Sequence, residues 1–108
     1  MADGLLVLKR GREVRYVVWS TVVDAPITYG MTEDELREYI REKYGRRGVD
    51  ELPARLERCA AKGTSFLGDR NHYAVVRSNR VGPRETCLSY KRIVEQYWQA
   101  PDDEVDRG

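Results

Sequence analysis

The longest apolar stretch of the chain covers residues 16–23 and consists mainly of valine, with one tyrosine and one tryptophan. β-Branched and aromatic side chains favour extended backbone, so this stretch predicts the main strand of a sheet, from about residue 13 or 15 to residue 23. A shorter apolar run over residues 4–9 precedes it, and Arg10-Gly11-Arg12 offers a glycine for the turn between them. We therefore expect an antiparallel hairpin. Both faces of the main strand are apolar, which predicts that other elements cover both sides of the sheet.

Helical spacing dominates the next part of the chain. Thr32 and Glu35 match a capping box, after which apolar residues recur every three or four positions until Gly45. A second helical pattern opens near Gly48 and stops at Gly63, where a left-handed residue would end it. Only four residues separate the two patterns, so we expect two helices folded against each other.

The last third of the chain predicts one strand and one helix. Residues 72–77 are rich in aromatic and β-branched side chains and predict a strand, followed by a polar loop over residues 78–86. Ser89 is placed to cap a final helix that ends before Pro101. The sequence thus predicts a single α+β domain over residues 1–100 in the order β-β-α-α-β-α. Its small antiparallel sheet would have two or three strands packed by three helices, with a disordered acidic tail over residues 101–108.

Charge and hydropathy argue against a membrane-spanning protein and against a secreted one. The formal net charge is +1, but the last eight residues carry −3, which leaves +4 on the rest. No stretch approaches the roughly 20 apolar residues that cross a bilayer, and no basic segment precedes the first apolar run. We expect a cytoplasmic protein without membrane contact.

Catalytic and metal-binding patterns are missing from the sequence. His72 is the only histidine, and no serine or cysteine has a histidine at a spacing that would activate it. Cys59 and Cys87 lack a C-x-x-C arrangement and are interpreted as small buried side chains, with a disulfide between them as the alternative. We therefore expect a protein that is not an enzyme and uses no cofactor or metal ion.

Residues 70–92 form a basic stretch that contains six cationic side chains and a single acidic one. Its cations could contact phosphates, and nearby tyrosines could stack on bases. Tyr29, Tyr90 and Trp98 could instead line a protein interface or a homodimer contact, because aromatic residues and arginine dominate such surfaces. The alternative for Trp98 is the core, since it lies with Tyr97 on the apolar stripe of the last predicted helix. The candidate binding residues are Arg77, Asn79, Arg80, Arg84, Lys91 and Arg92.

Three stretches of the chain, residues 18–32, residues 44–48 with 52–58, and residues 79–86, resemble small accessory proteins encoded by phages of actinobacteria, such as mycobacteriophages. The resemblance covers roughly residues 16–99. It implies a small protein that binds a host or phage component in the host cytoplasm, and it brings no catalytic residue with it.

Three functions follow as hypotheses, and the third and weakest is a small hydrolase-like enzyme whose site, with His72 in a pocket, only the folded chain would assemble. The first is a non-enzymatic interaction protein, in a phage context one that modulates a host protein or defence system. The alternative is a nucleic-acid-binding accessory protein that uses the basic stretch. The first predicts a captured partner that survives nuclease treatment, and the second predicts affinity that falls steeply with salt.

Overall fold

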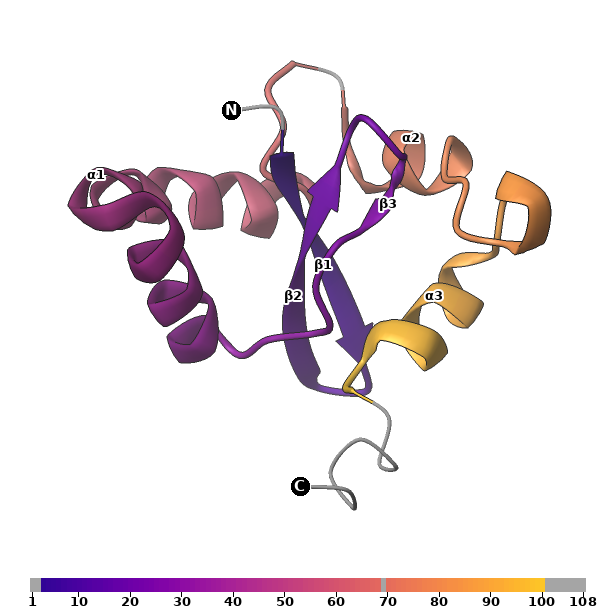
Figure 1. The fold of residues 1–108 in the computed structure, drawn as a ribbon, viewed down its shortest axis with the longest axis horizontal. Coiled ribbons are helices and arrows are strands. Elements are labelled where there is room, and N and C mark those ends of the chain that lie inside the picture. Colours follow the sequence, from indigo (N-terminus) through magenta and orange to yellow (C-terminus); the bar gives the residue numbers. More distant parts are fainter. Residues whose placement is uncertain (1–2, 69, 101–108) are drawn as a thin grey trace.

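A computed structural model describes residues 3–68 and 70–100. Its sheet has three antiparallel strands in the order β1 (Asp3–Arg10), β2 (Glu13–Ser20) and β3 (Ala25–Pro26) (Figure 1). The hairpin of β1 and β2 forms as predicted, and Gly11 takes the left-handed conformation in its turn. The α+β class, the antiparallel sheet and the number of helices are confirmed. The acidic tail lies outside the described residues.

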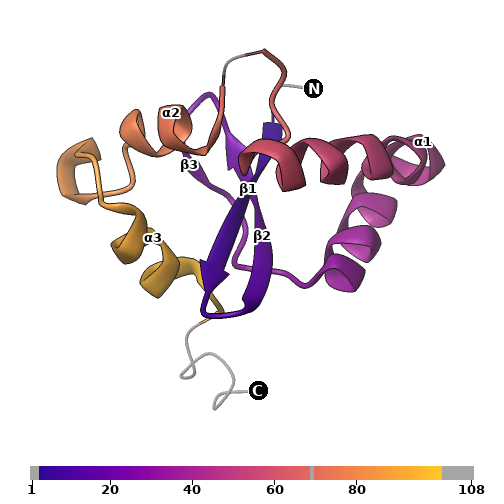
Figure 2. The same cartoon turned by 180° about the vertical axis from the view of Figure 1, so that it is seen from behind.

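Helices cover both faces of the sheet, as the apolar pattern predicted (Figures 1 and 2). The pleat sends Leu6 and Leu8 to one face, together with Trp19 of β2, and these side chains pack against the C-terminal helices. Leu5 and Val7 point to the opposite face, where they pack against the long helix α1. The sheet is therefore the centre of two apolar clusters.

The β1 edge of the sheet is covered by hydrogen bonds from outside it. Along β1, Val7 N–H donates to Gly63 O at 2.9 Å, and Ser65 pairs with Leu5 through both its N–H and its hydroxyl. The Tyr90 hydroxyl extends this cover by accepting from Lys9 N–H at 2.7 Å and donating to Val7 O at 3.2 Å. An exposed strand edge invites pairing with another chain, so these contacts protect the fold from aggregation.

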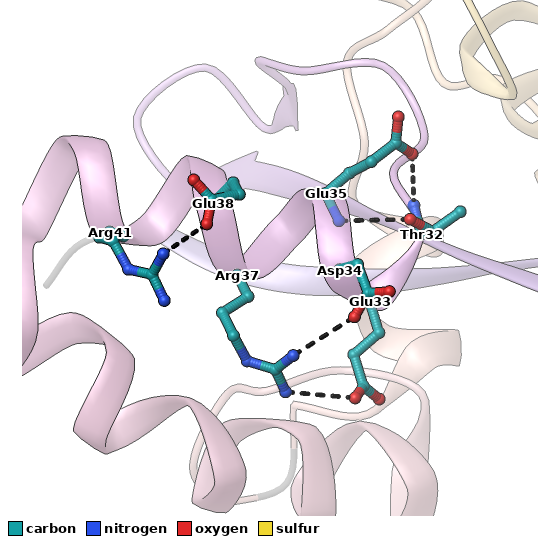
Figure 3. A network of polar contacts seen from close by, with 7 residues as sticks. All are labelled: Thr32, Glu33, Asp34, Glu35, Arg37, Glu38 and Arg41. Carbon is teal, nitrogen blue, oxygen red and sulfur yellow. Dashed lines mark hydrogen bonds and ion pairs between the residues drawn. The ribbon is translucent and has the colours of Figure 1, made fainter.

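The long helix α1 (Glu33–Lys62) contains both predicted helices, joined at a kink. Gly45 lies at the kink with φ 69° and ψ −159°, a conformation almost restricted to glycine, and Gly63 ends the helix in the left-handed region. Thr32 and Glu35 form the predicted capping box (Figure 3). Exposed ion pairs from Arg37 to Glu33 and Asp34, and from Arg41 to Glu38, follow along the same segment.

The predicted strand over residues 72–77 is wrong, because this segment is the helix α2 (His72–Arg77). The Asn71 side chain accepts from Ala74 N–H at 2.9 Å and caps the helix. Val75 is the one buried side chain of α2, and a single buried side chain does not require the alternating apolar and polar pattern of a strand. The cap and this single anchor override the strand preference of valine and tyrosine. The order is therefore β-β-β-α-α-α, with β3 supplying the third strand.

The chain closes with a short 3-10 turn η1 (Pro83–Glu85) and the helix α3 (Tyr90–Tyr97). Ser89 caps α3 by accepting from Arg92 N–H, as predicted. Ile93 and Val94 are buried against the sheet, and Trp98 follows them at 4% exposure. Of the two placements predicted for Trp98, the core is confirmed and the partner surface is wrong.

Candidate binding surfaces

The six candidate binding residues do not form one surface. Asn79 is buried at 2% exposure, whereas the five cationic residues are exposed on α2, on the 78–86 loop and on the first turn of α3. Each position is set by different contacts, and these decide which side chains remain available to a ligand.

Asn79 holds the loop together from inside. Its amide nitrogen donates to Leu88 O at 2.8 Å and to Val76 O, and its oxygen accepts from Leu88 N–H at 2.9 Å and Val81 N–H at 3.2 Å. An amide has few hydrogen-bonding sites, and these contacts occupy both its donor and its acceptor groups. The position of Asn79 is that of a side chain that fixes the loop, not one that reaches a ligand.

Arg80 is tied to the turn that follows β2. Its guanidinium donates through Nε and Nη2 to Asp24 Oδ2, at 3.0 and 2.8 Å, and its backbone N–H donates to Asp24 O at 2.9 Å. Hydrogen bonding to Asp24 and the charge of that carboxylate raise the pKa of Arg80 above its usual value. The 78–86 loop and the β2–β3 connection are therefore one connected surface.

The turn held by Arg80, residues 21–24, displays two valines to solvent and is called the valine turn below. The predicted strand to residue 23 is three residues too long, because the Ser20 hydroxyl accepts from Val22 N–H and Val23 N–H and turns the chain. Asp24 then takes a positive φ of 55°. Val22 is 74% exposed and Val23 50%, and Ile27 beyond β3 is 46% exposed.

Arg77 and Arg84 lie at the two ends of the same loop region. The Arg77 guanidinium lies 5.9 Å from the ring centroid of Tyr73, itself 69% exposed. Arg84 is exposed in η1 with a positive φ of 58°. These two cations are exposed to solvent.

Lys91 belongs to a different site, a cleft between α3 and the end of β1. Lys9, Arg10, Lys91 and Tyr90 line it with Val94 and Glu95, and its volume is about 640 Å³. Arg10 and Arg15 cover the Trp98 ring at 5.6 and 4.6 Å from its centroid, which adds positive charge beside the cleft. This basic cleft joins sequence-distant cations that the basic stretch alone did not include.

Of the residues considered for catalysis, His72 is half-buried and lines a cavity of about 310 Å³ together with Cys59 and Tyr90. His72 contacts the Tyr90 ring edge-on at 4.3 Å between centroids, and burial together with the charge of Lys9 lowers its pKa. Within residues 3–68 and 70–100, no group of three or more histidine, cysteine or acidic side chains could hold a metal ion. Both cysteines are free; Cys59 is buried as predicted, but Cys87 is exposed, which corrects the prediction for it.

Comparisons of the chain with protein-family models, with curated proteins and with solved structures give no match. The resemblance to actinobacterial phage proteins therefore stays a prediction. In the part of the chain that the structure describes, no helix combines the length and the apolar character that crossing a membrane requires.

Proposed function

We propose that this chain is a non-enzymatic binding protein that contacts a protein partner through the valine turn and the adjoining 78–86 loop. The observation that carries the proposal is the display of Val22 and Val23 on a turn whose backbone is fixed from both sides. Single exposed apolar side chains are ordinary on protein surfaces. A rigid turn that presents two of them together calls for another explanation.

The fixed backbone of the valine turn supports this function because little conformational entropy is lost when a partner binds. Binding costs free energy when a loop must be ordered, and a turn that is already ordered avoids this cost. The Ser20 hydroxyl holds the first half of the valine turn, and Arg80 holds Asp24 at the second half through three hydrogen bonds. The backbone of the valine turn is therefore already ordered before a partner binds.

The surrounding charges define the chemistry of the partner. Arg80 contacts the turn through Asp24, and Arg77 and Arg84 lie three residues before and four residues after Arg80 in the sequence. Arginine is prominent among residues that dominate protein interfaces. We infer a partner with an apolar socket for the valines and an acidic rim for the arginines. The resemblance to phage accessory proteins supports a host protein in the cytoplasm as this partner. A second copy of the chain is the other protein occupant.

The test is capture of partners with the immobilised chain and its Val22→Ser/Val23→Ser variant from nuclease-treated lysate. Val14→Ser is the matched control, because Val14 is 41% exposed at the opposite end of β2. We expect one protein to be retained by the wild type and the control but lost from the double variant. Equal retention by all three chains would refute the proposal, and self-association lost only in the double variant would identify a homodimer surface.

Nucleic-acid binding is the second candidate function, and the basic cleft favours it. Lys9, Arg10 and Lys91 converge there against Glu95 alone, with Tyr90 in the wall. Neutralised phosphates release counterions, so fluorescence anisotropy with labelled DNA and RNA should show affinity that falls steeply with salt. Arg10→Ala/Lys91→Ala should remove this binding, whereas the valine variants should keep it. Absence of binding at low salt would exclude this function.

A further inference from the structure

A third site lies between α1 and the start of β1, and its lining shares no residue with the two surfaces described above. A cavity of about 520 Å³ opens between the second half of α1, the start of β1 and the segment after Gly63. The helix contributes residues spaced three or four apart, which places them on one face. Its lining comprises Asp3, Gly4, Glu51, Ala54, Arg55, Arg58, Ser65, Phe66 and Leu67.

Arg55 is the unusual residue of this cavity. Its side chain is buried, with only 6% of the residue exposed, and Nη2 donates to the backbone oxygen of Asp3 at 3.4 Å. Its Nη1 is buried without a hydrogen-bond partner among the described residues. Burial lowers the pKa of Arg55 from its usual value, the sign of a charge held away from water. A guanidinium stays protonated under such conditions, so the charge needs a counter-ion.

The neighbours of Arg55 do not supply that counter-ion. Asp3 and Glu51 line the same cavity, yet among the described residues neither carboxylate forms an ion pair with Arg55 or Arg58. Arg58, one turn further along α1, adds a second guanidinium whose Nε donates to Ser65 O at 2.7 Å. The two like charges repel each other, so an anion between them would relieve the repulsion.

We propose that this cavity binds a small organic molecule through one oxyanion group, a phosphate or a carboxylate, held by Arg55 and Arg58. The forked geometry of a guanidinium suits both anions. The cavity is far larger than a single ion, and Phe66, Ala54 and Leu67 give it an apolar wall for the body of the ligand. Asp3 and Glu51 disfavour a second anionic group and accept hydrogen bonds from hydroxyl or ammonium groups of the ligand.

The experiment is NMR titration of the full-length protein with inorganic phosphate, glycerol 3-phosphate and glutamate at constant ionic strength. We expect saturable shifts of the amide signals of Gly4, Ala54, Ser65 and Leu67, with a dissociation constant of about 1 mM or tighter for one organic probe. Glycerol 3-phosphate and glutamate distinguish a phosphate from a carboxylate ligand. No saturable shift with any of the three at roughly 10 mM would overturn the proposal.

The variant Arg55→Met separates a ligand site from a structural arginine. It should weaken probe binding by roughly tenfold or more, because a charge-assisted hydrogen bond is lost, and it should raise the melting temperature of the ligand-free protein. Arg46→Met is the control, since the Arg46 side chain is 93% exposed on the same helix and pairs with Asp50, outside the cavity. If Arg55→Met does not fold, Arg58→Gln provides the binding test. A folded Arg55→Met protein that melts lower and binds the probe unchanged would contradict the proposal.

Discussion

Replacing Asn79 by alanine should destabilise the protein strongly, although the sequence alone suggests a surface loop residue. The side chain satisfies Leu88 N–H, Leu88 C=O and Val81 N–H, and it is 2% exposed. A buried polar group left without a partner costs roughly 1–3 kcal/mol. The variant leaves three such groups without Asn79, and water that enters the loop satisfies some of them. We therefore expect the free energy of unfolding to fall by about 2–4 kcal/mol in total.

Urea denaturation followed by tryptophan fluorescence measures this loss, because Trp19 and Trp98 are both buried. Asn71→Ala is the matched control, since Asn71 caps α2 from an exposed position and its loss should cost about 1 kcal/mol. Hydrogen exchange should also become faster at Val81 and Leu88. If Asn79→Ala costs no more than Asn71→Ala, the assignment of Asn79 as the residue that fixes the loop is wrong.

Three further predictions concern the sheet edge, the kink and the thiols. Tyr90→Phe should cost about 1 kcal/mol in urea denaturation, because Lys9 N–H and Val7 C=O lose the hydroxyl that covers them; an unchanged midpoint would argue against this edge cover. Gly45→Ala should cost about 1–3 kcal/mol from backbone strain alone, since a methyl group would meet no atom within 4 Å; a more stable variant would contradict the kink geometry. A thiol reagent at pH 8 should label Cys87 alone until the protein unfolds, because Cys59 is buried and burial raises its pKa to about 11. The ordinary pKa of a cysteine thiol is 9.0, so the Cys59 thiol loses its proton at lower pH in the unfolded chain than in the folded one. The free energy of unfolding should therefore fall as the pH rises from 9.0 toward 11, and Cys59→Ala should make this fall smaller.

The sequence predicts the parts of this fold that local chemistry determines. The hairpin follows from two apolar runs around Gly11, and the capping box at Thr32 and Glu35 requires only residues three apart. The helix end at Gly63 follows from a conformation that glycine adopts easily, whereas Gly45, predicted to end a helix before a four-residue connection, is a kink within α1. Each of these signals lies within a few residues of the feature it produces.

The errors arise where distant contacts or caps decide the outcome. Residues 72–77 have strand composition, yet the Asn71 cap makes them a helix, and this cap was a usable signal. The end of β2 depends on Ser20 bonding to the next turn, which strand propensity does not reveal.

The candidate surfaces depend still more on tertiary structure. The pairing of Arg80 with Asp24 spans 56 positions in the sequence, and the basic cleft joins β1 to α3. The cavity at Arg55 brings β1 against the second half of α1. Spacing along the chain carries no signal for these three contacts.

The most direct test of the proposed function is photo-crosslinking from the valine turn itself. A photoreactive phenylalanine analogue at position 22 should yield a crosslink to one protein in nuclease-treated lysate, and the same probe at position 14 should not. Asp24→Asn, which removes the charge that holds Arg80, should reduce the yield from position 22. Crosslinks of equal yield from both positions, or none from position 22 while a partner is still retained, would contradict binding through this turn.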